Sequence, residues 1–93
     1  TMADKEDLPE FEESEYEGIL GGVIYKGRNC IVVGMKQLES KRDGQPKRFV
    51  DIREHYYMAN EGRWQYTGKG VTLPIGEIEE LRDILERLEG LIE

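Results

Sequence analysis

Hydrophobic and polar residues alternate along residues 48–57, whose sequence is Arg-Phe-Val-Asp-Ile-Arg-Glu-His-Tyr-Tyr. Alternation with a period of two is typical of a β-strand that buries one face. Val50 and Ile52 share one face of such a strand, and Arg53 and His55 share the other. We therefore predict a central strand here. Val50 and Ile52 are expected to anchor the core, with charged and aromatic side chains on the opposite face.

Two further strands are predicted upstream of this stretch. Residues 30–38 alternate in the same way, and residues 18–25 indicate a shorter strand. Glycine and polar residues at 26–29 are typical of a turn between them. A polar loop at residues 39–47 contains an Asp-Gly pair, which is a hairpin signal. The pattern therefore favours consecutive antiparallel strands.

A helix is predicted at the C-terminal end. After a turn at residues 59–63, residues 64–73 indicate a short strand that is interrupted at Gly68-Lys69-Gly70. Pro74 is expected to open the helix, because first-turn amides lack intrahelical partners anyway. Apolar residues then recur at helical spacing, and acidic residues fill the other face. The fold class that follows is α+β, an antiparallel sheet followed by one C-terminal amphipathic helix.

The apolar stripe of this helix is wider than its own sheet is expected to cover. A second copy of the chain is therefore expected to pack on it, although a helix packed only on its own sheet stays an open alternative. The residues expected at this dimer interface are Ile78, Leu81, Leu85, Leu88 and Leu91.

Length and charge narrow the picture further. The chain has 93 residues, enough for one domain with a small core. Its formal net charge is −7, but residues 1–17 and 74–93 are acidic, whereas residues 18–73 are basic. Such asymmetry indicates a partner better than the total charge does. No apolar run is long enough to cross a membrane, and no signal peptide is evident.

Residues 1–17 are predicted to be an acidic, mobile tail, and residues 18–93 a single domain. Two interpretations of the tail stay open. It imitates nucleic acid and competes for the basic part of the chain, or it only keeps the protein in solution.

Catalytic and metal-binding patterns find little support. Cys30 is the only thiol and His55 the only histidine, and they lie on separate predicted strands. Cys30 is expected to be a small core residue and His55 a sheet residue. Gly68-Lys69-Gly70 lacks the spacing and hydroxyl residue of a phosphate-binding loop. We therefore expect no enzyme activity, no cofactor and no metal.

Basic residues interleaved with aromatic residues form the clearest functional pattern. Cations that follow phosphates and flat rings that stack on bases are what single-stranded nucleic acid requires. An ordinary antiparallel sheet, which favours aromatic residues, is the competing interpretation. The residues predicted to contact nucleic acid are Lys36, Lys41, Arg42, Lys47, Arg48, Arg53, Tyr56, Trp64 and Lys69.

The segments 49–58, 60–62 and 67–73 together resemble the C-terminal domain of the transcriptional coactivator positive cofactor four. They read Phe-Val-Asp-Ile-Arg-Glu-His-Tyr-Tyr-Met, Asn-Glu-Gly and Thr-Gly-Lys-Gly-Val-Thr-Leu. The resemblance implies a curved sheet of four to five strands, a homodimer formed through the helices, and binding of single-stranded DNA along the sheet.

Carried over by position, the resemblance gives roles to individual residues. Arg53 and Lys69 match DNA-contacting bases, Tyr56 takes the place of a stacking tryptophan, and Lys47 matches a basic residue at the start of the strand. Gly68 departs from the family, which often has a second base there. The loop before the central strand is longer than in the family and lacks its aromatic residue, leaving Lys41 and Arg42 as substitutes. The acidic N-terminus departs from eukaryotic members and favours a bacterial or phage-like relative.

The function expected from these observations is single-stranded DNA binding without catalysis, in transcription regulation or in DNA replication or repair. RNA stays open as a ligand, and transcription or replication proteins as partners. The location would be the nucleoid in the cytoplasm of a bacterial or phage host, or the nucleus of a eukaryote. The alternative is a protein-interaction module that acts through the acidic tail and the C-terminal helix.

One conflict remains in the sequence. Arg53 and Tyr56 fall on opposite faces of an ideal strand, although both are expected to contact the ligand. This predicts a bulge, a strong twist or a groove completed by a partner near residues 54–55.

Overall fold

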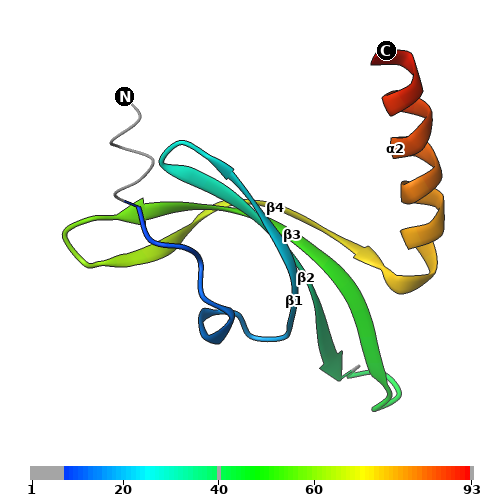
Figure 1. The fold of residues 1–93 in the computed structure, drawn as a ribbon. Coiled ribbons are helices and arrows are strands. Elements are labelled where there is room, and N and C mark those ends of the chain that lie inside the picture. The colour runs from blue at the N-terminus through cyan, green and yellow to red at the C-terminus, as the bar shows by residue number, and fades with distance from the viewer. Residues whose placement is uncertain (1–7, 40, 93) are drawn as a thin grey trace.

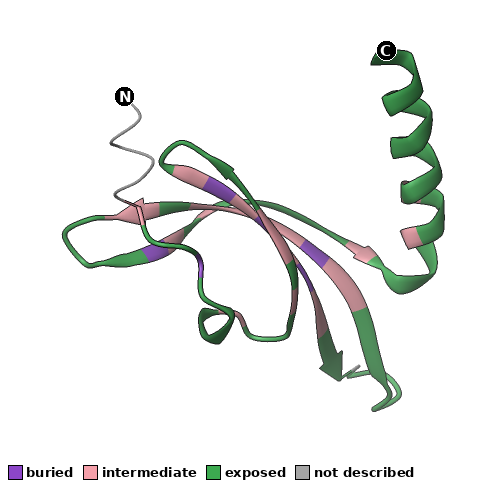
Figure 2. Ribbon diagram, in the orientation of Figure 1, coloured by how far each residue is buried: buried purple, intermediate pink, exposed green. Residues whose placement is uncertain are grey.

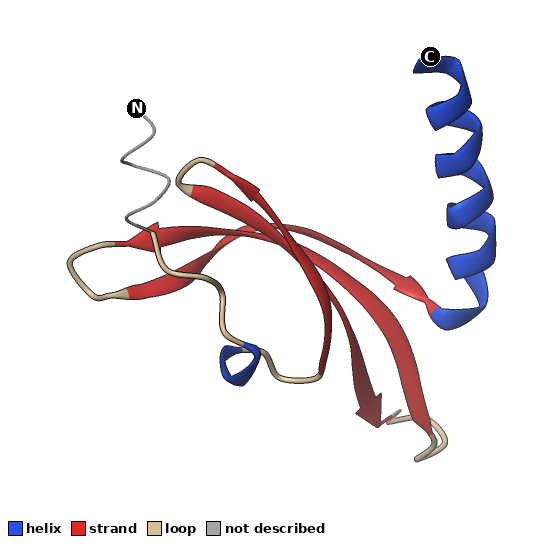
Figure 3. Cartoon of the chain, viewed as in Figure 1, coloured by secondary structure: helices blue, strands red, loops and turns tan. Residues whose placement is uncertain are grey.

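The computed structural model describes residues 8–39 and 41–92, which form one curved antiparallel sheet followed by a helix (Figures 1 and 3). The strands follow one another in space as they do along the chain, in the order β1-β2-β3-β4. The elements are the short 3₁₀ turn η1 (Glu13–Glu15), β1 (Ile19–Lys26), β2 (Asn29–Glu39), β3 (Pro46–Met58), β4 (Arg63–Pro74), the 3₁₀ turn η2 (Ile75–Glu77) and α2 (Ile78–Ile92). The predicted α+β class, an antiparallel sheet followed by one C-terminal helix, is confirmed.

Two boundaries differ from the sequence prediction. The predicted interruption at Gly68 is wrong, because β4 continues through it as a bulge in which Gly68 has a φ of 97°. In the β3–β4 ladder, Arg53 pairs with Gly70 and His55 with Tyr66, so the ladder loses its regular register opposite Glu54. Pro74 does not open α2 directly. Its extended backbone ends β4 and caps η2, which runs into α2.

Residues that pair across an antiparallel ladder lie on the same face of the sheet. The pairs Cys30–His55 and Val32–Arg53 therefore belong to one face. We call this the aromatic face; its residues include Tyr25, Cys30, Val32, Lys36, Asp51, Arg53, His55, Tyr57, Trp64 and Tyr66. The opposite, aliphatic face includes Ile24, Ile31, Val33, Met35, Val50, Ile52, Val71 and Leu73.

The small core lies on the aromatic face, which corrects the expectation that Val50 and Ile52 anchor it. Both of those residues are only half-buried. Figure 2 shows that buried positions are few and that most of the chain is intermediate or exposed. The buried hydrophobic residues are Phe11, Cys30, Val32 and Trp64. Phe11 reaches this face from the N-terminal segment, by which we mean residues 8–17. The aromatic face is therefore the side that this chain covers for itself.

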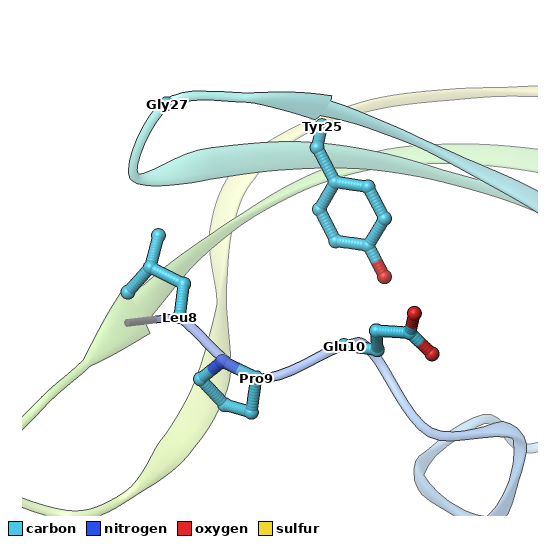
Figure 4. Close-up of a pocket in the computed structure, with 5 residues that line it drawn as sticks. All are labelled: Leu8, Pro9, Glu10, Tyr25 and Gly27. Carbon is cyan, nitrogen blue, oxygen red and sulfur yellow. The ribbon is translucent and has the colours of Figure 1, made fainter. Parts of the chain in front are cut away.

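The N-terminal segment runs along the hairpin of β1 and β2 (Figure 4). Leu8, Pro9 and Glu10 lie opposite Tyr25 and bound a hollow of about 350 Å³. The backbone N–H of Phe11 donates a hydrogen bond of 2.8 Å to the Tyr25 hydroxyl. The predicted tail thus has part of its length packed on the sheet, while residues 1–7 lie outside the described residues. The boundary between tail and domain at residue 17 stays a prediction.

Helix α2 stands beyond the end of β4 instead of lying across the sheet (Figure 1). Ile78 and Leu81 are half-buried, and Leu81 lines a hollow with Leu73. Leu85, Leu88 and Leu91 are 54%, 51% and 76% exposed. The molecule is only 19 Å across in its thinnest direction, which fits a single sheet layer. The single chain therefore leaves both the helical stripe and the aliphatic face largely open.

Candidate nucleic-acid interface

The site is built around the carboxylate of Asp51, which is fully buried on the aromatic face. Arg53, two residues further along β3, forms a hydrogen-bonded ion pair with it through Nε. The Nζ atom of Lys36 lies 3.8 Å from the same carboxylate, and the Tyr16 hydroxyl donates to it over 3.4 Å. A buried carboxylate is tolerated only with such partners. Asp51 therefore holds two cationic side chains at fixed places on the sheet.

Arg53 also interacts with Tyr66 on β4. Its Nη1 donates a hydrogen bond of 2.6 Å to the Tyr66 hydroxyl, and its guanidinium carbon lies 4.9 Å from the ring centroid. Gly70 makes this arrangement possible, because a Cβ atom there would lie 2.9 Å from Cγ of Arg53. The Tyr66 side of this Arg53–Tyr66 platform is 38% exposed. Guanidinium planes and aromatic rings are the groups on which unpaired bases stack.

The platform opens into a hollow of about 410 Å³ on the aromatic face. The sheet supplies basic and aromatic groups to it, and the N-terminal segment supplies acidic and aromatic groups. Its lining residues are Phe11, Glu15, Tyr16, Glu17, Lys36, Asp51, Arg53, His55 and Tyr66. Acidic side chains of one segment thus share a hollow with the two cations that Asp51 fixes.

Burial sets the protonation of three groups near this hollow. It lowers the pKa of His55 below its ordinary 6.5, so the imidazole is neutral at pH 7. Burial, helped by the charge of Asp51, raises the pKa of Tyr16 to about 12, which keeps its hydroxyl a hydrogen-bond donor. Burial raises the pKa of the Cys30 thiol to about 11 and keeps it protonated. A protonated buried thiol is a poor nucleophile.

The structure brings some of the predicted contact residues together on the aromatic face. Lys36 and Arg53 are neighbours through Asp51. Lys47 is on the same face and more exposed, with its Nζ 3.8 Å from Asp43. Trp64 also faces this side but is 7% exposed, packed against Tyr57 at 5.3 Å between ring centroids. Trp64, which was predicted to stack on a base, therefore lies in the core of the single chain.

Other predicted contact residues lie elsewhere. Tyr56 is on the aliphatic face and 37% exposed. Arg48 is on the same face, where its Nε donates a hydrogen bond of 3.2 Å to Gln37. Lys41 and Arg42 are exposed in the loop between β2 and β3, and Lys69 is exposed in the β4 bulge. The basic residues therefore surround the sheet instead of forming one patch.

The expected bulge near residues 54–55 is present, but it lies on β4 opposite Glu54. The β2–β3 ladder stays regular through this region, pairing Val32 with Arg53 and Asn29 with Tyr56. Arg53 and Tyr56 consequently remain on opposite faces. The bulge instead displaces Lys69, whose backbone N–H donates to the Thr67 hydroxyl over 3.2 Å.

The list of predicted contact residues leaves out several residues of this site. Tyr66 lies two positions after Trp64, so the period of two could have placed it on the same face as Arg53. The same rule places Asp51 on the face of Arg53, but it does not show that Asp51 is buried. Phe11 and Tyr16 gave no periodic signal, because they are isolated aromatic residues in an acidic stretch.

Among residues 8–39 and 41–92, no cluster of His, Cys, Asp or Glu side chains could hold a metal ion. Within the same ranges, α2 falls short of the length and apolar character that crossing a bilayer requires.

The fold and the Arg53–Tyr66 platform define a small α+β domain whose sheet carries partly exposed aromatic side chains. Residues 43–84, from the loop before β3 into α2, match the family model described as Transcriptional Coactivator p15 (PC4). The resemblance seen in the sequence is thereby confirmed. The family consists of non-enzymatic domains that bind single-stranded DNA and act in transcription regulation. No curated protein and no solved structure matches the chain.

Proposed function

We propose that this chain is a non-enzymatic single-stranded DNA-binding protein that uses basic and aromatic residues of its sheet, in transcription regulation or in DNA replication or repair. The observation that carries this proposal is the Arg53–Tyr66 platform. Both residues lie within the segment that matches the family model, and Lys36, which shares the Asp51 carboxylate with Arg53, lies outside it. The family supports the coarser part, single-strand binding and a role connected with transcription. Its site in the cell would be the nucleoid or the nucleus, where such a ligand occurs.

The chemistry requires no covalent step. Arg53 and Lys36 are held in place by Asp51 and would neutralise phosphates without a large loss of side-chain freedom. Tyr66 is 38% exposed and would stack on a base. Exposed cations around the sheet, namely Lys41, Arg42, Lys47, Arg48 and Lys69, would follow the backbone on either side. If about four phosphates are neutralised, the log–log salt slope is near −3.

Tyr56 places a geometric condition on this binding mode. It lies on the face opposite Arg53 and is 37% exposed. One DNA strand can contact both Arg53 and Tyr56 only if it crosses an edge of the sheet or binds to two protomers. Tyr56 would then stack on a base outside the hollow that Arg53 lines.

We also propose that the chain forms a homodimer. The exposed Leu85, Leu88 and Leu91 of α2, with the open aliphatic face, would give a second copy a continuous apolar surface. Ile78 and Leu81 begin the same stripe and are half-buried. The molar mass in solution, from light scattering coupled to size-exclusion chromatography, tests this assembly: twice 10.8 kDa supports it, and 10.8 kDa contradicts it.

Fluorescence anisotropy tests the binding proposal. A labelled strand of about 20 nucleotides and its duplex are titrated with the protein across a series of salt concentrations. We expect tighter binding to the strand, weakening as salt rises. Absence of binding at low salt, or equal binding to both forms, would contradict the proposal.

The exposed stripe of α2 favours one competing function, a protein-interaction module that acts through the helix and the acidic tail. Such a module would have no preference for a single strand. The same titration therefore separates the two functions.

A further inference from the structure

Phe11 of the N-terminal segment occupies a seat on the aromatic face. Its ring is 8% exposed and meets the His55 ring edge-on, with centroids 5.4 Å apart. Trp64, Cys30 and Val32 belong to the same buried cluster. A flat six-membered ring from a separate segment thus lies on the sheet where its aromatic side chains gather.

Tyr16 occupies a second seat. Its ring lies on Gly34, where a Cβ atom would come within 2.5 Å of it. The Nζ atom of Lys36 is 5.1 Å from the ring centroid, and the hydroxyl donates to Asp51. The seat therefore combines a flat floor, a cation over the ring and an acceptor at its edge. A nucleobase offers matching features, because it is planar, has a π-face and carries polar groups on its edge.

Carboxylates accompany the two rings. Four exposed glutamates lie close to Phe11 and Tyr16 in the sequence, namely Glu12, Glu13, Glu15 and Glu17. Glu15 and Glu17 line the hollow that Lys36 and Arg53 also line. Residues 11–17 thus present rings to the sheet and negative charge beside its cations, as a short single strand presents bases and phosphates.

We propose that the seats of Phe11 and Tyr16 are binding sites for unpaired nucleobases, and that residues 8–17 cover them until a strand displaces the segment. This inference rests on the proposed function and adds the location of two base sites. It also gives Trp64 a role, because Trp64 belongs to the same buried cluster as Phe11 and that cluster opens when the segment leaves.

The attachment of the segment is suited to displacement. The hydrogen bonds that join it to the sheet run from Phe11 N–H to Tyr25 and from Tyr16 to Asp51, the second of them long at 3.4 Å. The turn η1 satisfies its own polar groups, with Glu12 N–H donating to the Glu15 carboxylate and Tyr16 N–H to the Glu13 carbonyl. Two hydrogen bonds thus hold the segment together with the packing of Phe11 and Tyr16, and a local opening that breaks these costs less than global unfolding.

Trp64 is the only tryptophan of the chain, so tryptophan fluorescence reports directly on the surroundings of this residue. The full chain and its Phe11→Ala variant are each titrated with a 20-mer of thymidylate, recording both Trp64 emission and binding affinity. We expect the strand to quench Trp64 emission in the unaltered chain. We also expect Phe11→Ala to bind about five- to tenfold more tightly, because the sites no longer have to be uncovered. Far-UV circular dichroism checks that the variant folds.

A charge variant makes the test independent of the core. Glu13→Gln, Glu15→Gln and Glu17→Gln together remove three exposed acids of the segment and leave Phe11 and Tyr16 in place. The matched control, Glu79→Gln, Glu80→Gln and Glu86→Gln, makes the same charge change on α2. The segment variant should bind the 20-mer several-fold more tightly than the control variant does.

The outcomes separate this inference from the proposed function. If the unaltered chain binds the strand but Trp64 emission stays constant, and the segment variants bind no more tightly than the control, the base sites lie elsewhere and the inference is overturned. If the segment variants bind more weakly, residues 8–17 form part of the ligand site, which also overturns the covering role. If no variant binds the strand, the proposed function fails, and the inference with it.

Discussion

The ring of Tyr16 lies so close to Gly34 that a Cβ atom at position 34 would come within 2.5 Å of it. We predict that Gly34→Ala destabilises the fold by about 1–3 kcal/mol, because overpacking forces the ring off its seat. Thermal unfolding followed by circular dichroism measures the change. Gly22→Ala is the matched control, since a Cβ atom there would meet nothing within 4 Å. Equal melting temperatures for the two variants would show that the Tyr16 contact contributes nothing.

Arg53 is expected to matter for stability as well as for binding. Replacing it by Met removes the hydrogen-bonded partner of the fully buried Asp51, and we predict a loss of about 2–4 kcal/mol. Arg63→Met removes an equivalent ion pair with Glu61 in which both side chains are exposed, and should cost less than about 1 kcal/mol. Urea unfolding of both variants makes the comparison. A loss at Arg53 no greater than that at Arg63 would contradict the role of the buried carboxylate.

His55 gives the stability a defined pH dependence. Burial lowers its pKa in the folded chain, so the unfolded chain binds the proton more readily. Its contribution is fully present above the ordinary pKa of 6.5 and is lost as pH falls from there through the folded pKa. A hydrogen bond with the Arg53 backbone and the charge of Asp51 oppose this lowering of the pKa, whereas the charges of Lys36 and Arg53 reinforce it.

The corresponding measurement is the melting temperature of the chain and of His55→Gln between pH of about 7.5 and about 5. The unaltered chain should lose more stability on acidification than the variant, because only its own imidazole titrates. Parallel pH profiles would show that the surroundings of His55 do not disfavour its charge.

Lys69 and Tyr56 are expected to affect DNA binding in different ways. Lys69→Ala should weaken binding and reduce the salt slope by about 0.7, the value for one phosphate contact on a single strand. Tyr56→Ala should weaken binding by about 1–3 kcal/mol with little change in slope, because stacking releases no counterions. Anisotropy at several salt concentrations separates the two effects. Equal changes in slope would refute the assignment of these roles.

Helix α2 is expected to carry the dimer contact. Leu88 is 51% exposed in the single chain, so Leu88→Glu should leave an isolated protomer intact but place a charge in the apolar contact. We predict a shift toward monomer and a melting temperature that no longer depends on concentration. Arg87→Gln changes the net charge by the same amount and should leave the mass unchanged. A dimer that persists in Leu88→Glu would move the interface elsewhere.

The sequence predicted the strands because alternation survives wherever one face is buried. It predicted the wrong face as the core, because the apolar side of β3, with Val50 and Ile52, was expected to be the buried one. The choice depends on Phe11, a lone aromatic residue whose acidic neighbours suggested a tail. The alternation of residues along β3 thus defines two faces, but residues 8–17, which are distant in sequence, determine which face becomes the core.

The site was predictable to a similar extent. The period of two placed Arg53 on the charged face, and Lys36 pairs into the same face through β2. The buried position of Asp51 was not predictable, because it follows from contacts among three separate elements. Trp64 was expected to stack on a base, and its burial in the cluster that includes Phe11 could not be predicted from the local pattern.

The most direct test of the account locates the ligand on the protein. Backbone amide chemical shifts are recorded by NMR while a 20-mer of thymidylate, or a duplex of equal length, is added. We predict that the single strand shifts the amides of Lys36, Arg53 and Tyr66 on the aromatic face and of Lys69 in the bulge, and that the duplex shifts them less at equal concentration. Shifts confined to α2, or equal shifts with strand and duplex, would contradict the assignment of the sheet as a single-stranded DNA-binding surface.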